Sequence, residues 1–203
     1  MTLKRLLFSF LLIGMALFSA ESSPHIVDSV HSQINFVAEA RFFSCHGYFD
    51  KWDAQIDLDA NKIENSSVKI TIDANSINTR VDRRNQHLKS KDFFYTEKYP
   101  AITFVSKKVE KAGQNTYNVI GDLTIRDVTK EISIPIEEVF YTSPRGRFRG
   151  SFTISRKEFG VSFDSPMNPI QDAVLVQLDI NALDKAAMEK MQQQQQQAKP
   201  SNQ

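Results

Sequence analysis

Apolar and polar residues alternate with a period of two through most of the middle of the chain, which is the pattern of half-buried β-strands. Around residue 70, for example, Val68, Ile70 and Ile72 fall on one face, and polar residues fall on the other. The same alternation recurs in six further segments, with little helical periodicity between them. Their apolar faces comprise Ile34, Phe36 and Ala38; Ile102 and Phe104; Val119, Leu123 and Ile125; Ile132, Ile134 and Ile136; Phe148, Phe152 and Ile154; and Val174, Val176, Leu178 and Ile180.

These segments, together with Gly47–Leu58, predict roughly eight strands joined by short polar connections. An antiparallel sheet of that size can close into a barrel, which removes its exposed edges and leaves room for one small or slender ligand. Pro135 falls on the outward phase of its segment. Because proline has no N–H to donate to a ladder, it predicts an edge, a bulge or a strand break there. The predicted fold is an all-β, eight-stranded antiparallel barrel.

Residues 78–88 interrupt the alternation. Thr79 and Asp82 fit the Ser/Thr-x-x-Asp/Glu pattern of a helix start. Val81 and Leu88 lie seven residues apart, on the same face of the helix that would follow. We therefore expect a short helical segment that plugs one end of the barrel.

The N-terminal residues 1–22 have the features of a secretory signal peptide. Lys4 and Arg5 precede a largely apolar run, Leu6–Phe18, which is interrupted only by Ser9 and Gly14 and is too short to span a bilayer. We expect cleavage near residues 20–22, a periplasmic or secreted protein, and no stable membrane insertion after cleavage.

The barrel is expected to occupy residues 23–183, and the composition changes after it. Residues 184–203 are rich in Ala, Met and Lys and contain six consecutive glutamines. Such a composition is typical of a helical extension that ends in a disordered tail.

Composition and charge exclude several functions. With 203 residues, 41% of them apolar, the chain suits one domain with a sizeable core. Its formal net charge of +1 argues against nucleic acid as the main partner. The single cysteine, Cys45, allows no internal disulfide, and the four histidines form no zinc-spacing motif. No catalytic motif is present, so we expect no catalytic residue, no metal and no cofactor.

The 15 phenylalanines are the strongest hint from composition. Several fall on the inward phase of the predicted strands. On composition alone, they fit an ordinary aromatic core as well as the lining of a binding pocket.

Two motifs resemble the signature of the YceI-like family. The first is R-N-Q-H-L-K-S-K-D-F-F followed by E-K-Y-P, within Arg84–Pro100, and the second is G-D-L-T-I-R-D-V-T-K, Gly121–Lys130. Family-like pieces flank them, namely H-S-Q-I-N-F, G-Y-F-D-K-W and S-R-K-E-F-G-V, so the resemblance spans about His25–Leu183. The chain departs from the family pattern at Asn85, where Asp is usual, and at Asp127, where a turn Gly is usual.

The resemblance implies a lipocalin-like barrel that carries a long-chain amphiphile in an elongated internal pocket. The ligand would be a polyisoprenoid, a quinone-type lipid or a fatty-acid amide, and the protein would be a homodimer. The residues expected to bind this ligand are Phe36, Phe49, Ile70, Ile72, Arg84, His87, Phe94, Phe104, Leu123, Ile134, Phe152, Phe163 and Val176. For His87, a role in tying the helix to the sheet by hydrogen bonds is the alternative to a head-group contact.

Two other functions stay open at this point. The first is a stress-related interaction protein whose barrel core is fully packed and whose outer surface binds partners. The second is an enzyme that acts on an isoprenoid lipid. A cavity inside the barrel distinguishes the carrier from the packed interaction protein.

Overall fold

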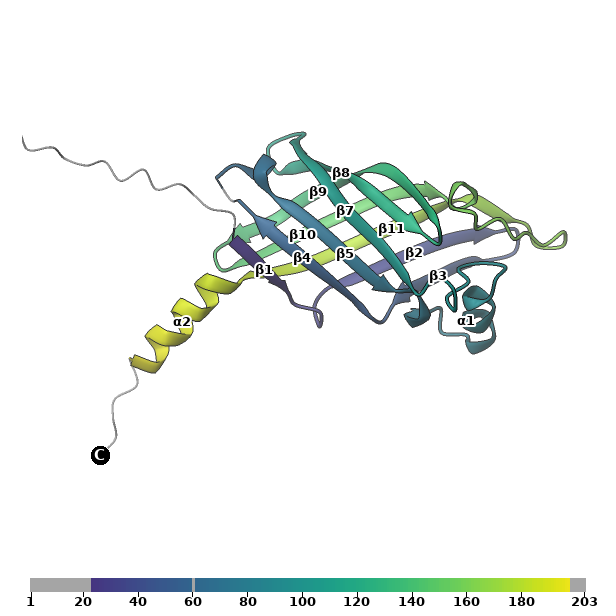
Figure 1. Cartoon of the computed structure of the whole chain (residues 1–203), viewed down its shortest axis with the longest axis horizontal. Coiled ribbons are helices and arrows are strands. Elements are labelled where there is room, and N and C mark those ends of the chain that lie inside the picture. Colours follow the sequence, from purple (N-terminus) through teal and green to yellow (C-terminus); the bar gives the residue numbers. More distant parts are fainter. Residues whose placement is uncertain (1–22, 60, 198–203) are drawn as a thin grey trace, which may run out of the picture.

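Antiparallel strands curl into a closed barrel in the computed structural model, which describes residues 23–59 and 61–197 (Figure 1). The strands are β1 (Ser23–Val27), β2 (Gln33–Ala40), β3 (Ser44–Phe49), β4 (Trp52–Leu58), β5 (Ser67–Asp73), β6 (Ile77–Asn78), β7 (Ala101–Lys111), β8 (Thr116–Ile125), β9 (Val128–Thr142), β10 (Arg145–Ser155) and β11 (Ile170–Asp184). The short 3-10 helices are η1 (Ile63–Asn65), η2 (Ala74–Ser76) and η3 (Lys157–Phe159). Pairing of β11 with β1 closes the ring.

The eleven strand segments of the described chain occupy eight positions around the barrel. Both β1 and β2 pair with β11, so together they act as one barrel strand that is broken at residues 28–32. In the same way, β3 continues into β4 and β5 into β6, because β4 pairs with β5 and β3 pairs with β6. The predicted eight-stranded antiparallel barrel is confirmed. Its three breaks were not predicted, because alternation along a strand does not record which neighbour the strand pairs with.

Pro135 lies where β9 and β10 part. Pairing between these strands ends at Ile136 and Gly150, although β9 continues to pair with β8 past the proline. Pro135 offers no N–H to a neighbouring strand. Of the three predicted alternatives, the edge is confirmed, because β9 itself runs unbroken through the proline and only its pairing with β10 ends. Beyond it, the first half of β9 and the last half of β10 are not paired with each other, and η3 packs against β9.

Helix α1 (Asp82–Lys89) lies at the end of the barrel opposite β1 and α2 (Lys185–Gln197), as Figure 1 shows. The helical segment predicted at one end is therefore confirmed, but its predicted start was wrong. Val81, not Thr79, is the N-cap residue, and no side chain caps the helix. Instead, the side-chain oxygen of Asn85 accepts hydrogen bonds from the Thr79 N–H at 2.8 Å and from the Thr79 hydroxyl at 2.7 Å. The amide oxygen of Asn85 thus accepts the two hydrogen bonds that a carboxylate oxygen would accept at this position.

The half of the barrel farther from α1 is packed solid. Its interior is filled by buried side chains that include Ile56, Leu58, Val109, Val119, Ile180 and Ala182. Residues 1–22, predicted as a signal peptide, and residues 198–203, the end of the predicted tail, lie outside the described residues. No helix in the described part of the chain is both long and apolar enough to cross a bilayer.

Candidate ligand-binding cavity

The half of the barrel nearer α1 encloses a cavity of about 740 Å³. This volume lies within the range of roughly 300–1,000 Å³ that is usual for small-molecule sites. Along β11, lining residues run from Ile170 to Leu178. At ~3.3 Å per residue and a strand tilt of about 40°, this stretch covers about 20 Å of the barrel axis. None of the buried residues named above for the far half lines the cavity, so the packed half closes its inner end.

All thirteen residues predicted as ligand-binding line this cavity, and the lining is almost entirely apolar. Phe36, Phe152 and Val176 are only half-buried although they point into the barrel, because their exposed surface faces the cavity. Gly47 on β3 makes room for one of these rings, since a Cβ there would lie 2.2 Å from Cζ of Phe36. Whether these side chains contact a ligand stays a prediction, but the interior is not the solid core that the interaction-protein alternative requires.

Besides Phe94 and Phe163, further loop residues complete the lining, and these were not predicted from the sequence. Phe43 comes from the β2–β3 hairpin, and Phe159 and Val161 come from η3 and the chain after it. No periodic pattern marks residues in such short connections, so strand alternation could not identify them. Val81 and Leu88, predicted on one face of the helix, both line the cavity.

Phe43 and Val81 line the cavity and are also exposed, so the cavity opens to solvent beside them, and we call this opening the mouth. Arg84 is placed there mainly by its contacts with Thr79. Its Nε donates to the Thr79 hydroxyl at 2.8 Å, and its Nη2 donates to the Thr79 carbonyl at 2.7 Å. Its guanidinium also lies over the ring of Phe43, 5.9 Å from the centroid. These contacts join the entry of α1 to the β2–β3 hairpin, so Arg84 shapes the mouth as well as lining it.

Arg83 is a mouth residue that the sequence analysis did not select. It is exposed, lines the cavity and forms no ion pair with any described residue. In contrast to Arg84, its guanidinium is free to meet a polar head group. The family motif singles out Arg84 but says nothing of Arg83, and only the folded contact of Arg84 with Thr79 separates the roles of the two arginines.

His87 does not tie α1 to the sheet by hydrogen bonds, so that alternative was wrong. Its Nε2 lies 3.1 Å from Oδ2 of Asp92, in the turn that follows the helix. Its ring packs edge-on against Phe93 and Phe163, with centroids 5.0 and 4.9 Å away. His87 therefore joins α1 to the next turn and to the β10–β11 connection at the cavity wall.

The turn Arg126-Asp127 fastens the helical plug to the barrel. Arg126 adopts the left-handed conformation with φ of 58°, which is uncommon for a residue other than glycine, asparagine or aspartate. Nη1 of Arg126 donates to the carbonyls of Phe93 at 3.2 Å and Gly160 at 2.6 Å. The hydroxyl of Tyr99 donates to Asp127 at 2.8 Å. The second family motif thus has a structural role in the described fold.

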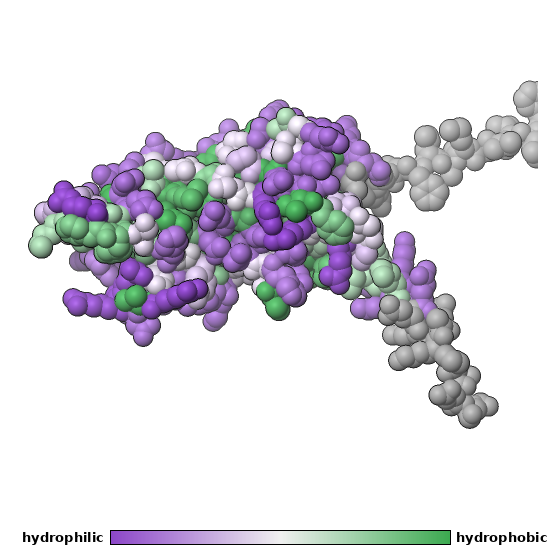
Figure 2. Space-filling model, turned by 180° about the vertical axis from the view of Figure 1, so that it is seen from behind, coloured by the Kyte–Doolittle hydropathy of each residue, from purple (hydrophilic) through white to green (hydrophobic). Residues whose placement is uncertain are grey.

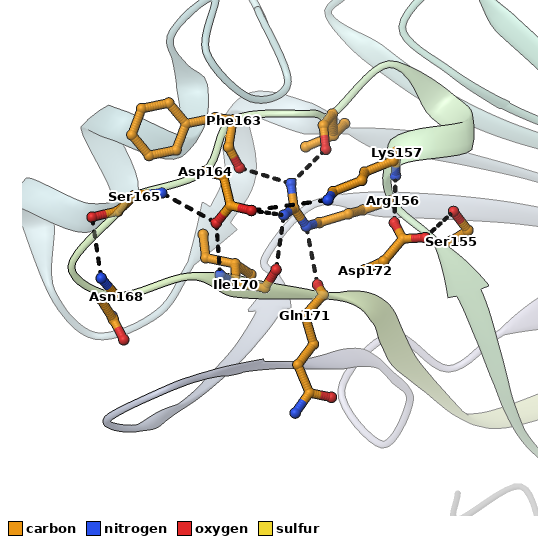
Figure 3. A network of polar contacts seen from close by, with 11 residues as sticks. Ser155, Arg156, Lys157, Phe163, Asp164, Ser165, Asn168, Ile170, Gln171 and Asp172 are labelled. Atoms are coloured by element: carbon orange, nitrogen blue, oxygen red, sulfur yellow. Dashed lines mark hydrogen bonds and ion pairs between the residues drawn. The ribbon is translucent and has the colours of Figure 1, made fainter.

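Arg156 organises the β10–β11 connection, residues 156–169, from inside (Figure 3). Its side chain is 6% exposed. The guanidinium donates to four backbone carbonyls at 2.8–3.0 Å, those of Val161, Phe163, Ile170 and Gln171. A single side chain therefore holds both ends of this connection against the cavity.

Two carboxylates complete the network around Arg156. The Ile170 N–H, and then the nearby Arg156 and Lys157, hold the pKa of Asp164 below its usual value. Asp172 accepts hydrogen bonds from the Lys157 N–H at 2.9 Å and from the Ser155 hydroxyl at 2.7 Å, and these bonds lower its pKa. The connection is thus ordered by polar contacts, although one side of it lines an apolar cavity.

The only cysteine, Cys45, lines the cavity and is half-buried. Burial raises the pKa of its thiol, and the charge of Arg84 opposes this shift. At about pH 8, we therefore expect a maleimide to label Cys45 more slowly than a peptide thiol, because less thiolate is present. The labelling rate should rise as the pH approaches the raised pKa. At any given pH, a bound long-chain amphiphile should make labelling slower than in the empty protein.

Labelling followed by intact mass spectrometry measures this rate. Protein unfolded in urea is the control and should react like a peptide thiol. If folded and unfolded protein react at equal rates across this pH range, Cys45 does not face an enclosed space.

Comparisons with known proteins agree with this architecture. A protein of Pseudomonas savastanoi pv. phaseolicola named UPF0312 protein is 31% identical over 175 residues, covering 80% of this chain and 90% of that protein. The crystal structure of Burkholderia cenocepacia BcnA superimposes with a TM-score of 0.72 at 29% identity, covering 76% of this chain and 98% of that one. A polyisoprenoid binding domain from Saccharophagus degradans shares the fold at 16% identity, with a TM-score of 0.63 and coverage of 80% and 99%. The model of the YceI-like domain matches residues 26–182, and the chain therefore belongs to the YceI-like family.

Proposed function

We propose that this protein is a periplasmic or secreted carrier that holds a long-chain amphiphile in its barrel. The cavity of about 740 Å³, lined by apolar side chains and closed at its inner end, is the observation that carries the proposal. The candidate ligands are a polyisoprenoid, a quinone-type lipid and a fatty-acid amide. That a protein with the same fold is named a polyisoprenoid binding domain supports the first of these.

Hydrophobic transfer can supply the affinity without specific polar contacts. Each methylene removed from water contributes ~0.8 kcal/mol, so a chain of about ten carbons gains on the order of 8 kcal/mol before ordering costs. Polar groups at the mouth, Arg83 above all, would then select the head group.

The lining supports binding over turnover. Cys45, Arg83, Arg84, His87 and Arg156 are its titratable side chains, and no carboxylate lines the described cavity. The arginines are permanently charged, the thiol is mostly protonated, and His87 has its carboxylate partner, Asp92, outside the lining. This set lacks a paired general acid and base, so we propose a non-enzymatic role.

A chain-length series tests the proposal. Equilibrium binding of linear alcohols should tighten about fourfold for each added methylene until the chain fills the cavity, and should then level off. A polyprenol should bind at least as tightly as the longest alcohol that fits. Affinity that does not depend on chain length would contradict a carrier of long chains.

The homodimer that the family resemblance implies is also part of the proposal. Light scattering at micromolar concentration should give about twice the mass of one chain. A monomer mass across the accessible concentrations would contradict this part alone and would leave the carrier role untouched.

A further inference from the structure

Four large apolar side chains are exposed around the mouth of the cavity. Phe42 is 70% exposed, Phe43 50%, Val81 46% and Met167 79%. They belong to three segments that are distant in sequence. We call these segments together, residues 41–44, 80–84 and 165–169, the rim.

The three segments of the rim are fastened to one another. The N–H of Phe42 donates to the side-chain oxygen of Asn168 at 3.1 Å, and the N–H of Arg41 donates to the Pro169 carbonyl at 3.2 Å. Arg84 links the third segment through its contact with the ring of Phe43. The apolar side chains therefore belong to one continuous surface, and Phe43 and Val81 carry that surface into the cavity.

The rim is also basic. It contains four arginines, at positions 41, 80, 83 and 84, and a single carboxylate, that of Asp82. Arg41, Arg80 and Arg83 are exposed and form no ion pair with any described residue. Figure 2 shows apolar side chains beside hydrophilic ones at this end of the molecule, away from α2. Exposed apolar groups surrounded by unpaired cations match the interface of a bilayer that contains anionic lipids.

We propose that the rim docks the protein on the surface of an anionic lipid bilayer. Phe42 and Met167 enter the interfacial layer, the arginines meet lipid phosphates, and the mouth of the cavity faces the membrane. A hydrocarbon chain then passes between bilayer and cavity without crossing water. This inference goes beyond the carrier role, because it concerns the surface against which the mouth docks. It does not depend on which amphiphile the cavity holds.

Sedimentation with vesicles tests the proposal. The protein is purified in the form that the expressing cells produce. Intact mass spectrometry identifies its N-terminus, which must be the same in all variants. The vesicles are phosphatidylcholine with or without about 30% phosphatidylglycerol. We expect binding to the anionic vesicles that weakens when salt is added, and little binding to pure phosphatidylcholine.

Two rim variants have matched controls elsewhere on the chain. The double variant Phe42→Ser, Met167→Ser should lose tenfold or more in partitioning. Its control is Val30→Ser, Phe140→Ser, which removes two apolar side chains that are also exposed. The double variant Arg41→Gln, Arg83→Gln should lose roughly fivefold in partitioning for each charge removed. Its control is Arg145→Gln, Lys185→Gln, which removes two cations at the opposite end of the barrel and should leave partitioning unchanged.

Three results would overturn the proposal. The first is a wild-type protein that does not sediment with anionic vesicles. The second is an equal effect of the rim variants and their controls. The third is a rim variant that changes only the oligomeric mass, which would make the rim an interface between copies of the chain. The double serine variant leaves Phe43 and Val81 in the cavity wall, so its ligand content tests the carrier role separately.

Discussion

Replacing Ala38 with Trp is expected to abolish most long-chain binding while leaving the protein as stable as the wild type. Ala38 lies on β2 with its side chain in the cavity lining, opposite Val174 on β11. If the indole excludes about four methylenes of the ligand, ~3 kcal/mol of transfer free energy is lost, which is about a 150-fold weaker complex. Because the indole enters empty space, no overpacking strain is expected.

Val37→Trp is the matched control for this variant. Val37 precedes Ala38 on the same strand, does not line the cavity and points to the opposite face. Its replacement should leave ligand affinity unchanged. Binding isotherms of the two variants measure ligand affinity, and thermal melts measure stability. If Ala38→Trp lowers stability by the 1–3 kcal/mol or so that is typical of overpacked cores and Val37→Trp does not, the interior near Ala38 is full.

Replacing Arg156 with Met is expected to lower the stability of the protein strongly, although the residue lies in a loop. The thioether side chain has a similar length but no donors, so four backbone carbonyls lose the hydrogen bonds of the guanidinium. We expect a loss on the order of 3 kcal/mol, which lowers the melting temperature by about 6–12 °C in a chain of this size. Proteolysis should become fast within residues 157–169, the connection that Arg156 holds.

Lys157→Met is the control for Arg156. Lys157 is exposed, and its Nζ lies 3.9 Å from the carboxylate of Asp164. Loss of such a surface pair should change stability by less than about 0.5 kcal/mol. Equal melting temperatures for Arg156→Met and the wild type would show that the network of Figure 3 does not order the connection.

The inward-facing residues could be predicted because strand alternation assigns each residue to one face of a sheet. Residues such as Ile70, Phe104 and Val176 follow from period and phase alone, and they line the cavity. The family resemblance then supplied what periodicity cannot, namely that the interior holds a cavity and is not packed throughout. Without the resemblance, the phenylalanines of the chain fit a solid core as well as they fit the lining of a binding pocket.

Several features that lie outside the strands could not be predicted. Arg156 is a charged residue in a short polar stretch, and its burial depends on carbonyls from as far along the chain as Gln171. The exposure of Phe42 and Met167 depends on where two loop tips meet in space. The left-handed conformation of Arg126 could not be predicted either, because hydrogen bonds to distant carbonyls stabilise it and the residue's own propensity does not favour it.

Mass spectrometry of an organic extract tests the central claim most directly, because it asks whether the cavity is occupied in the native protein. Protein purified without detergent should yield one class of long-chain amphiphile, close to one molecule per chain. Val37→Trp should retain it, and Ala38→Trp should lose most of it. An extract without any such amphiphile, together with no uptake of an added polyprenol by the wild type, would contradict the carrier role.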